Sequence, residues 1–210
     1  MKLHLGCGLV YLDGYINIDY PLDNHSVQDK SVADIYSNLL ELKYPEGTIE
    51  EIRLHHVFEH FSRAQALALL ANWNAWLKVG GLLRIETPDF FISAIQVLNP
   101  FRSFSSRMST MRHIFGSQEA HWANHYEGYN KKLYKFILPK FGFKIIEIKK
   151  NAWKGTYNIE IIAVKNHDIN VESALNSANL IFKNYMVDDS NGENLLLKYW
   201  NSEFKKFINI

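Results

Sequence analysis

The chain has 210 residues, of which 47% are hydrophobic, 14% aromatic and 21% charged, so it can bury the core of one domain or slightly more. Its 23 Lys and Arg residues nearly balance its 22 Asp and Glu residues, which argues against binding nucleic acid or an anionic membrane through bulk charge. The single cysteine, Cys7, excludes a disulfide framework and a multi-cysteine zinc site. Together with the lack of a signal peptide and of an apolar run of about 18 residues, it indicates a cytoplasmic protein.

The first half of the chain alternates strand-like runs with turns. Runs rich in β-branched and aromatic residues predict short strands over residues 2–5, 14–19, 31–36 and 50–56. Ser62 and Gln65 form a capping-box pair, which predicts that a helix begins there. Leucines and tryptophans give this helix a broad apolar side, and Gly80-Gly81 is expected to end it.

The second half begins with a strand over residues 82–87, which Pro88 ends, and continues with an irregular stretch of short helices and loops over residues 89–130. The remaining patterns predict a helix over 131–141, a strand pair over 143–150 and 157–165, and helices over 171–187 and 193–208. This order predicts an α/β fold: a doubly wound, mostly parallel seven-stranded sheet with an antiparallel terminal hairpin strand, plus C-terminal helices. Composition places a boundary near Asn166, between a domain over residues 1–165 and a helical extension over 166–210.

Ligands of such sheets gather at the carboxyl ends of the strands. The residues at these ends are Gly6-Cys7-Gly8, Asp19, Asn38, His55-His56 and Thr87-Pro88-Asp89. Glycines let a ligand approach the backbone closely, and an acid that closes a strand can bind both hydroxyls of a ribose. In a dinucleotide-binding fingerprint the acid follows the glycines by about 20 residues, but the interval from Gly6 to Asp19 is shorter, and position 11 is Tyr instead of the third Gly. A nicotinamide cofactor is therefore disfavoured. A ligand of the nucleoside type is still compatible with these residues.

Several short motifs follow one another along residues 2–165. They are Leu3-His4-Leu5-Gly6-Cys7-Gly8, the strand Gly14-Tyr15-Ile16-Asn17-Ile18-Asp19, the segment His55-His56-Val57-Phe58-Glu59-His60-Phe61, the Gly80-Gly81 turn with the strand after it, and Lys140-Phe141-Gly142-Phe143. In this order they resemble the motifs of S-adenosylmethionine-dependent methyltransferases of the Rossmann-like class. The chain is most similar to a small bacterial branch associated with the modification of surface and capsular polysaccharides.

This resemblance implies S-adenosylmethionine as the cofactor and S-adenosylhomocysteine as the product. The turn of Gly6, Cys7 and Gly8 would pass beneath the methionyl part of the cofactor. Asp19 would hold the ribose hydroxyls, and Tyr20 would flank the adenine.

The adenine amine has two candidate partners. In the family, an acidic residue before a Leu contacts this amine, and Asn38-Leu39 occupies that place here. The role therefore stays with the Asn38 amide or shifts to Asp34. His55 and His56 would end their strand beside the sulfonium, on opposite sides, so at most one of them faces the cofactor.

Transfer of a methyl group to a hydroxyl needs a base, and histidine is the natural base near neutral pH. The candidates are His56, His121 and His125, with Tyr126 next to the last. The sequence does not choose among them.

Residues 90–118 contain no Asp or Glu but include Arg102, Arg107 and Arg112. Arginine side chains suit the recognition of phosphate, although a solvated helix face is the ordinary alternative. The next segment alternates aromatic and polar residues, among them Trp122 and Tyr129, as sites for sugars do. We interpret residues 89–130 as an insert that covers the substrate; the alternative is that its aromatic residues only pack in the core. We expect the methyl acceptor to be anionic. Candidates are a phosphorylated or nucleotide-linked sugar and a phosphoramidate precursor of a surface polysaccharide.

Two other classes of function compete with this interpretation. The segment from His56 to His60 matches the inverted zinc-protease pattern His-x-x-Glu-His, which would indicate a metal-dependent hydrolase. That site needs both histidines on one continuous helix, whereas His56 ends a strand and the cap Ser62 follows His60, so we expect no metal. A binding module that keeps the fold without catalysis is the second alternative.

The expected partner is a small molecule or a glycan precursor. No extended basic stripe exists outside the insert, so nucleic acid is not expected, and neither is a membrane. The C-terminal helices carry more apolar residues than a tail needs. They either pack on the sheet or form a homodimer contact.

Overall fold

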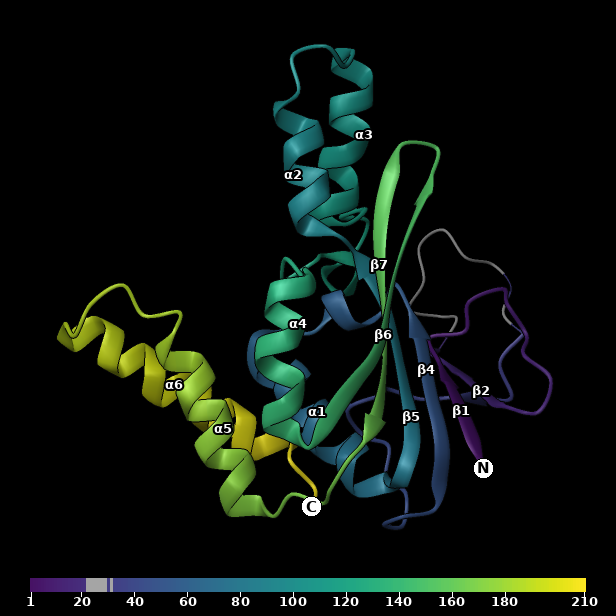
Figure 1. Ribbon diagram of the computed structural model, residues 1–210, viewed down its shortest axis with the longest axis vertical. Helices are drawn as coiled ribbons and strands as arrows, with labels where there is room; N and C mark the ends of the chain where they lie inside the picture. Colours follow the sequence, from purple (N-terminus) through teal and green to yellow (C-terminus); the bar gives the residue numbers. More distant parts are fainter. Residues whose placement is uncertain (22–29, 31) are drawn as a thin grey trace.

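A computed structural model describes residues 1–21, 30 and 32–210, and within them seven strands form one sheet in the order β3-β2-β1-β4-β5-β7-β6 (Figure 1). The strands are β1 Lys2–Leu5, β2 Ile16–Asp19, β3 Ile35–Tyr36, β4 Ile49–His55, β5 Leu77–Pro88, β6 Phe143–Trp153 and β7 Thr156–Lys165. Strands β1 to β5 run parallel, and β7 is inserted antiparallel between β5 and β6. The predicted fold class is confirmed. Ser31, where the third strand was expected to begin, lies outside the described residues.

The helices are η2 Phe58–His60, α1 Arg63–Trp76, α2 Phe90–Leu98, α3 Phe104–Phe115, η3 His121–Ala123, α4 Lys131–Ile137, η4 Leu138–Phe141, α5 Val171–Lys183 and α6 Asn191–Phe207. The capping box that predicted the start of α1 is present, because Ser62 N donates to Gln65 Oε1 and Gln65 N donates to Ser62 Oγ. Among the described residues, none of the helices combines the length and the apolarity that crossing a bilayer requires.

The end of α1 differs from the prediction. The helix stops at Trp76, and Gly80-Gly81 lies inside β5 instead of closing the helix. Leu77 is already extended and fully buried, and it pairs with Ile49 of β4. Pairing within the sheet therefore overrides the local helical pattern, and Gly80, with φ of +83°, lies where the register between the two strands shifts.

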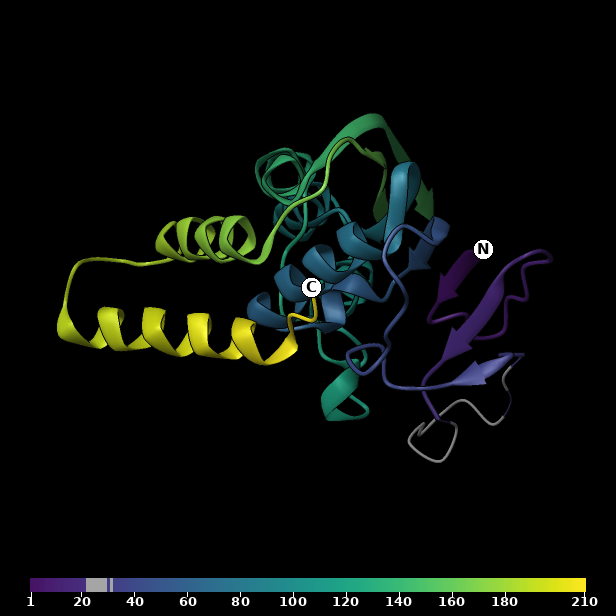
Figure 2. The same ribbon diagram turned by 90° about the horizontal axis from the view of Figure 1, so that it is seen from below.

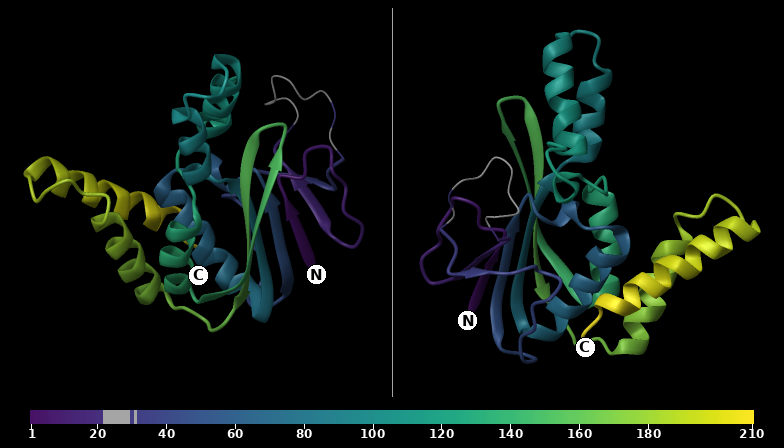
Figure 3. Two further views of the ribbon diagram at one scale, coloured as in Figure 1. Left: turned by 45° about the horizontal axis from the view of Figure 1, so that its top comes forward. Right: turned by 180° about the vertical axis from the view of Figure 1, so that it is seen from behind.

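The two faces of the sheet differ in chemistry. Helices α1, α4, α5 and α6 lie on one face (Figures 1 and 3), where alternate strand residues such as Leu54, Ile85 and Ile161 are fully or almost fully buried. The other face is polar, and there Arg84 Nε lies 2.8 Å from Glu51 Oε1. The link from β1 to β2, residues 6–15, contains no helix, so this face of the sheet keeps its charged residues.

The C-terminal helices pack on α1. Phe204 of α6 is fully buried, and Asn72 of α1 binds the end of α6 by donating to the Phe207 carbonyl and accepting from Asn209 N. Figure 2 shows α5 and α6 as an antiparallel pair that extends away from the sheet. Their outer part exposes large apolar side chains, namely Leu180, Val187, Leu195 and Tyr199. Self-association through this surface, and the boundary at residue 166, stay predictions.

The insert over residues 89–130 is more regular than expected. Helices α2 and α3 form a hairpin that rises beyond the end of β5, next to the tip of the β6–β7 hairpin (Figures 1 and 3). Because β5 runs toward this end, the hairpin flanks the carboxyl edge of the parallel strands.

Candidate functional site

The turn after β1 brings its backbone against the end of β2. Gly6 N and Cys7 N both donate to the Ile18 carbonyl, at 2.8 and 3.1 Å. Gly6 has φ of +66°, and a Cβ added there would lie 2.3 Å from Val57 Cγ2, so the position requires glycine. A Cβ added at Gly8 would meet no atom of the described residues within 4 Å. The backbone at Gly8 is therefore open to close approach by a ligand.

Asp19 ends β2 beside this turn. Its Oδ2 accepts from Gly8 N at 2.9 Å, and its Oδ1 accepts from Tyr20 N at 2.8 Å. Each carboxylate oxygen has used one of its two lone-pair positions, so each can still accept a hydroxyl. The structure thus brings together Gly6, Cys7, Gly8, Asp19 and Tyr20, as the sequence predicts.

The two candidates for the adenine amine have local partners. Asp34 Oδ2 accepts from the backbone N and the side-chain amide of Asn17, at 2.8 and 3.1 Å, and these hydrogen bonds lower the pKa of Asp34. Asn38 Oδ1 accepts from Leu40 N at 3.1 Å, and the neighbouring Leu39 packs in the core. Asp34 therefore holds the loop to β2, and the contact of either residue with adenine stays a prediction.

His55 and His56 separate at the end of β4. His55 stays on the polar face, where its Nε2 lies 3.2 Å from Arg53 Nε, and burial lowers its pKa. His56 leaves the strand with φ of +53° and lies between two carboxylates. Its Nδ1 is 3.2 Å from Glu59 Oε1, and its Nε2 is 3.6 Å from Glu86 Oε1. Burial disfavours the protonated form of His56 and lowers its pKa. The two carboxylates favour the protonated form more strongly, so the pKa of His56 is raised to about 9.

A chain of hydrogen bonds leads from Glu86, the ion-pair partner of His56, to the insert. Asn151 Nδ2 donates to Glu86 Oε2, and Asn158 Nδ2 donates to Asn151 Oδ1, both at 2.9 Å. His113 Nε2, on α3, lies 2.9 Å from Asn158 Oδ1, and its ring centroid is 5.6 Å from that of His56. This polar network ties the α2–α3 hairpin to the carboxyl edge of the sheet.

Four residues of this network were not predicted as site residues: Glu86, Asn151, Asn158 and His113. Glu86 belongs to a motif that carried the resemblance, so its position was a usable signal. Asn151 and Asn158 meet only because β6 and β7 pair at this register, which no local pattern states.

The predicted residues of the 121–129 segment lie in different surroundings. His121 and Tyr126 are exposed, and the Tyr126 hydroxyl donates to the His121 carbonyl. Tyr129 is almost fully buried and stacks on Tyr134, with ring centroids 5.0 Å apart. This favours the packing alternative for Tyr129, whereas Trp122 is half-buried.

Two of the three arginines bind atoms of the hairpins. Arg102 donates to Thr110 Oγ1 and to the Gly155 carbonyl, and so joins α3 to the β6–β7 turn. Arg107 Nε donates to the Val97 carbonyl at 2.7 Å. Arg112 is exposed. The role of the three arginines toward an anionic acceptor stays a prediction.

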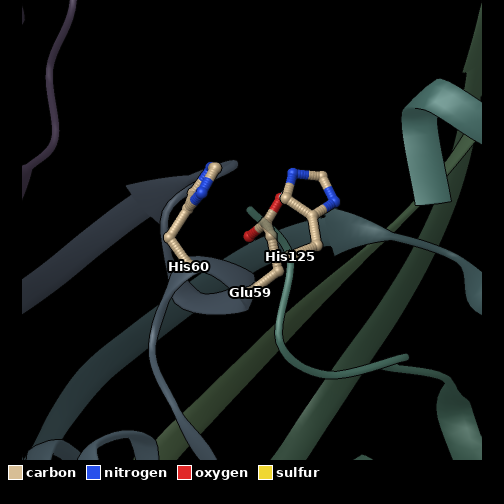
Figure 4. A group of neighbouring side chains, drawn as sticks. All are labelled: Glu59, His60 and His125. Atoms are coloured by element: carbon tan, nitrogen blue, oxygen red, sulfur yellow. The ribbon is translucent and has the colours of Figure 1, made fainter. Parts of the chain in front are cut away.

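Glu59, His60 and His125 form a second cluster next to His56 (Figure 4). Glu59 is almost fully buried, and its Oε1 lies 4.0 Å from His125 Nε2. The rings of His60 and His125 meet edge to face, with centroids 4.7 Å apart. His56 is not part of this group, and Phe58–His60 is a single short 3-10 turn. The continuous helix that the inverted zinc-protease pattern needs is therefore not formed there.

No protein-family model matches the chain, and no curated protein matches it. Solved structures do share its fold. One is a chain from the complex between the Haloferax volcanii Trm112 methyltransferase activator and a methyltransferase, with a TM-score of 0.55 at 11% identity over 80% of this chain and 83% of that one. Another is the S-adenosylmethionine dependent methyltransferase of Mesorhizobium loti, with a TM-score of 0.52 at 11% identity over 78% and 89%.

A third is the 1,6-didemethyltoxoflavin-N1-methyltransferase of Burkholderia thailandensis, solved with 1,6-didemethyltoxoflavin and S-adenosylhomocysteine. Its TM-score is 0.51 at 13% identity, over 79% of this chain and 71% of that one. At these identities the likeness establishes the fold. The chain has the Rossmann-like α/β fold of the S-adenosylmethionine-dependent methyltransferases.

Proposed function

We propose that the protein transfers the methyl group of S-adenosylmethionine to an oxygen of a small, polar, anionic acceptor. The observation that carries this proposal is the Asp19 carboxylate, held beside the open Gly8 backbone where β1 and β2 end. In open α/β sheets, ligands bind at this edge. The fold comparison supports the same reaction class.

The residues at this edge fit an adenosyl cofactor. Asp19 keeps one acceptor position on each oxygen, which matches the two hydroxyls of a ribose. The left-handed turn at Gly6 and Gly8 leaves room for the methionyl part against the backbone. When bound, the cofactor supplies a methyl group already activated by the positive sulfur, so the chain has mainly to position the acceptor and exclude water.

The proton of an acceptor hydroxyl needs a base, and the geometry of His56 disfavours it for this role. Both of its ring nitrogens lie against carboxylates, Glu59 and Glu86, so neither faces an acceptor freely. We place the proton on His121 or His125 instead, the two other histidines predicted as bases, because His113 Nε2 already donates to Asn158 Oδ1. His56 then acts as a positioning residue that fixes the two acids.

The acceptor is proposed from the insert. The segment 90–118 carries three arginines and no acid, and the exposed Arg112 and the half-buried Trp122 belong to the insert that flanks the same edge of the sheet. An arginine and an aromatic face suit a phosphorylated or nucleotide-linked sugar, or a phosphoramidate precursor. This chemistry supports a role in building a surface polysaccharide, with the methyl acceptor in the cytoplasm.

The test is calorimetric titration of the purified chain with S-adenosylhomocysteine, followed by a labelled-methyl transfer assay on sugar phosphates and nucleotide sugars. Asp19→Asn should weaken binding roughly 10- to 100-fold, because a hydrogen bond to a charged group contributes about 1.5–3 kcal/mol. Asp13→Asn is the matched control, since Asp13 is exposed and precedes the amino end of β2. Unchanged binding by Asp19→Asn would contradict the proposed site, and binding without any methyl transfer would favour a non-catalytic module.

A further inference from the structure

We propose that Glu59, His60 and His125 bind a zinc ion. The three side chains come from two segments that the backbone holds together. Tyr126 N donates to the Glu59 carbonyl at 2.8 Å, and His125 N donates to the Phe115 carbonyl at 3.2 Å. The insert is thereby fixed over η2, and one atom from each of the three side chains lies within 4.8 Å of the others (Figure 4).

The tautomer of His125 directs a lone pair into the cluster. Its Nδ1 lies 3.1 Å from the Ile114 carbonyl oxygen, which can only accept, so Nδ1 carries the proton. The Nε2 atom is then an acceptor, 4.0 Å from a carboxylate oxygen of Glu59. Two acceptors that face each other in a buried place repel unless a positive centre lies between them. A zinc-bound histidine usually donates the N–H of its other ring nitrogen to an acceptor such as a backbone carbonyl, which fixes the orientation of the ring.

Two further atoms of the cluster lack partners. Glu59 Oε2 and His60 Nδ1 are buried, and neither has a hydrogen-bond partner among the residues that the structure describes. A buried polar atom without a partner destabilises the folded state. The other oxygen of Glu59 is bound by His56, so the carboxylate is already oriented by a neighbour, as ligating carboxylates are. A cation at this position would satisfy both orphaned atoms at once.

The donor set selects the class of metal. Two imidazoles and one carboxylate suit zinc and similar first-row ions, whereas magnesium and calcium take oxygen ligands. Zinc ligands lie about 2.0–2.1 Å from the metal, and hence roughly 3.4 Å from one another, so rotation of the side chains has to close the group by about 1 Å. Three protein ligands leave the fourth position open, as in catalytic zinc sites.

This assignment opposes the expectation of a protein without metal, and it differs from the inverted zinc-protease pattern, because His125 replaces His56. It also removes His125 from the candidate bases, which leaves His121. Binding of zinc requires no cofactor, so the proposal stands or falls independently of methyl transfer.

The experiment uses the full chain after treatment with a chelator. Zinc is added, the excess is removed by dialysis, and the retained metal is measured; cobalt is added in parallel and its visible spectrum is recorded. We expect one equivalent of zinc and a cobalt spectrum typical of four-coordinate nitrogen and oxygen ligands. His60→Ala and His125→Ala should each lower zinc affinity at least about tenfold, as loss of a ligand does.

His167→Ala is the matched control, because His167 is exposed and lies outside the cluster. It should bind zinc like the unaltered chain, and so should Asp19→Asn, while His60→Ala should still bind S-adenosylhomocysteine. The proposal is overturned if the unaltered chain retains neither zinc nor cobalt, or if folded His60→Ala and His125→Ala variants bind zinc as tightly as it does. Should those variants unfold, an octahedral cobalt spectrum of the unaltered chain would overturn it.

Discussion

Gly6 and Gly8 occupy the same turn but are constrained for different reasons. Both have positive φ, which costs an L-residue about 1–2 kcal/mol. At Gly6 a Cβ would also collide with Val57, whereas at Gly8 it would meet no atom within 4 Å in the part of the chain that the structure describes. The turn is therefore held in place from behind by the segment that follows β4, and it is open in front toward the proposed cofactor.

This difference predicts unequal losses of stability. Gly6→Ala should lower the free energy of unfolding by about 2–5 kcal/mol, since overpacking adds about 1–3 kcal/mol to the backbone strain. Gly8→Ala should lower it by about 1–2 kcal/mol. Denaturant unfolding measures both. Val57→Ala should recover part of the loss in the Gly6→Ala background, and a double-mutant cycle without coupling between the two positions would show that the collision does not occur.

The residues of this turn illustrate what local sequence can reveal. Gly6, Gly8 and Asp19 stand within a short stretch, so their types and spacing already indicate the turn and the acid beside it. Glu59 and His125 lie 66 positions apart, and their proximity depends on how the insert docks on η2. Local sequence therefore predicts that the residues of this turn lie together, whereas the proximity of Glu59 and His125 depends on the tertiary fold.

At the scale of elements, helices were predicted well where their ends have local signals. The capping box of α1 and the left-handed Gly142 after η4 are both present. The end of α1 was predicted wrongly because the pairing of Leu77 with Ile49 is a contact between distant parts of the chain. Side-chain caps are local interactions, whereas strand pairing is decided by the whole sheet.

Helix α6 provides an element-scale prediction. Phe204 is fully buried, and its ring centroid lies 6.4 Å from that of Phe141. Leu195, on the same helix, is 57% exposed. Phe204→Ala should lower the free energy of unfolding by about 3–5 kcal/mol, and Leu195→Ala by no more than about 0.5 kcal/mol. Unfolding in denaturant, followed by circular dichroism, compares the two. Equal and small effects would mean that α6 is not docked on α1 in solution.

At the scale of the whole molecule, the arrangement of charge follows from the missing helix between β1 and β2. One face of the sheet lies under helices and is apolar, and the other keeps ion pairs such as Arg84 with Glu51. The polar network around His56 and Glu86 lies at the carboxyl end of this polar face. The site thus extends a polar surface instead of interrupting an apolar core.

The same arrangement buries neutral histidines. Burial is the largest cause that lowers the pKa of four of them, His4, His55, His113 and His125. A histidine in the unfolded chain has a pKa of about 6.5. Below that pH these four histidines bind more protons in the unfolded chain than in the folded chain. Their part of the stability is therefore complete above about pH 6.5 and is lost as the pH falls.

His4 is the member that tests this best, because it lies in β1 away from the proposed metal ligands. Its Nδ1 lies 3.0 Å from Asn17 Oδ1, burial lowers its pKa, and nearby Arg53 adds to the effect. His4→Asn can keep a hydrogen bond to Asn17 while removing the titrating group. The free energy of unfolding, measured from pH 7.5 to pH 5, should therefore fall less steeply in this variant than in the unaltered chain. His167→Asn is the control: His167 is exposed, so its replacement should leave the pH dependence of the unfolding free energy unchanged. Parallel curves for all three proteins would show that His4 does not change its protonation between the folded and unfolded states in this range.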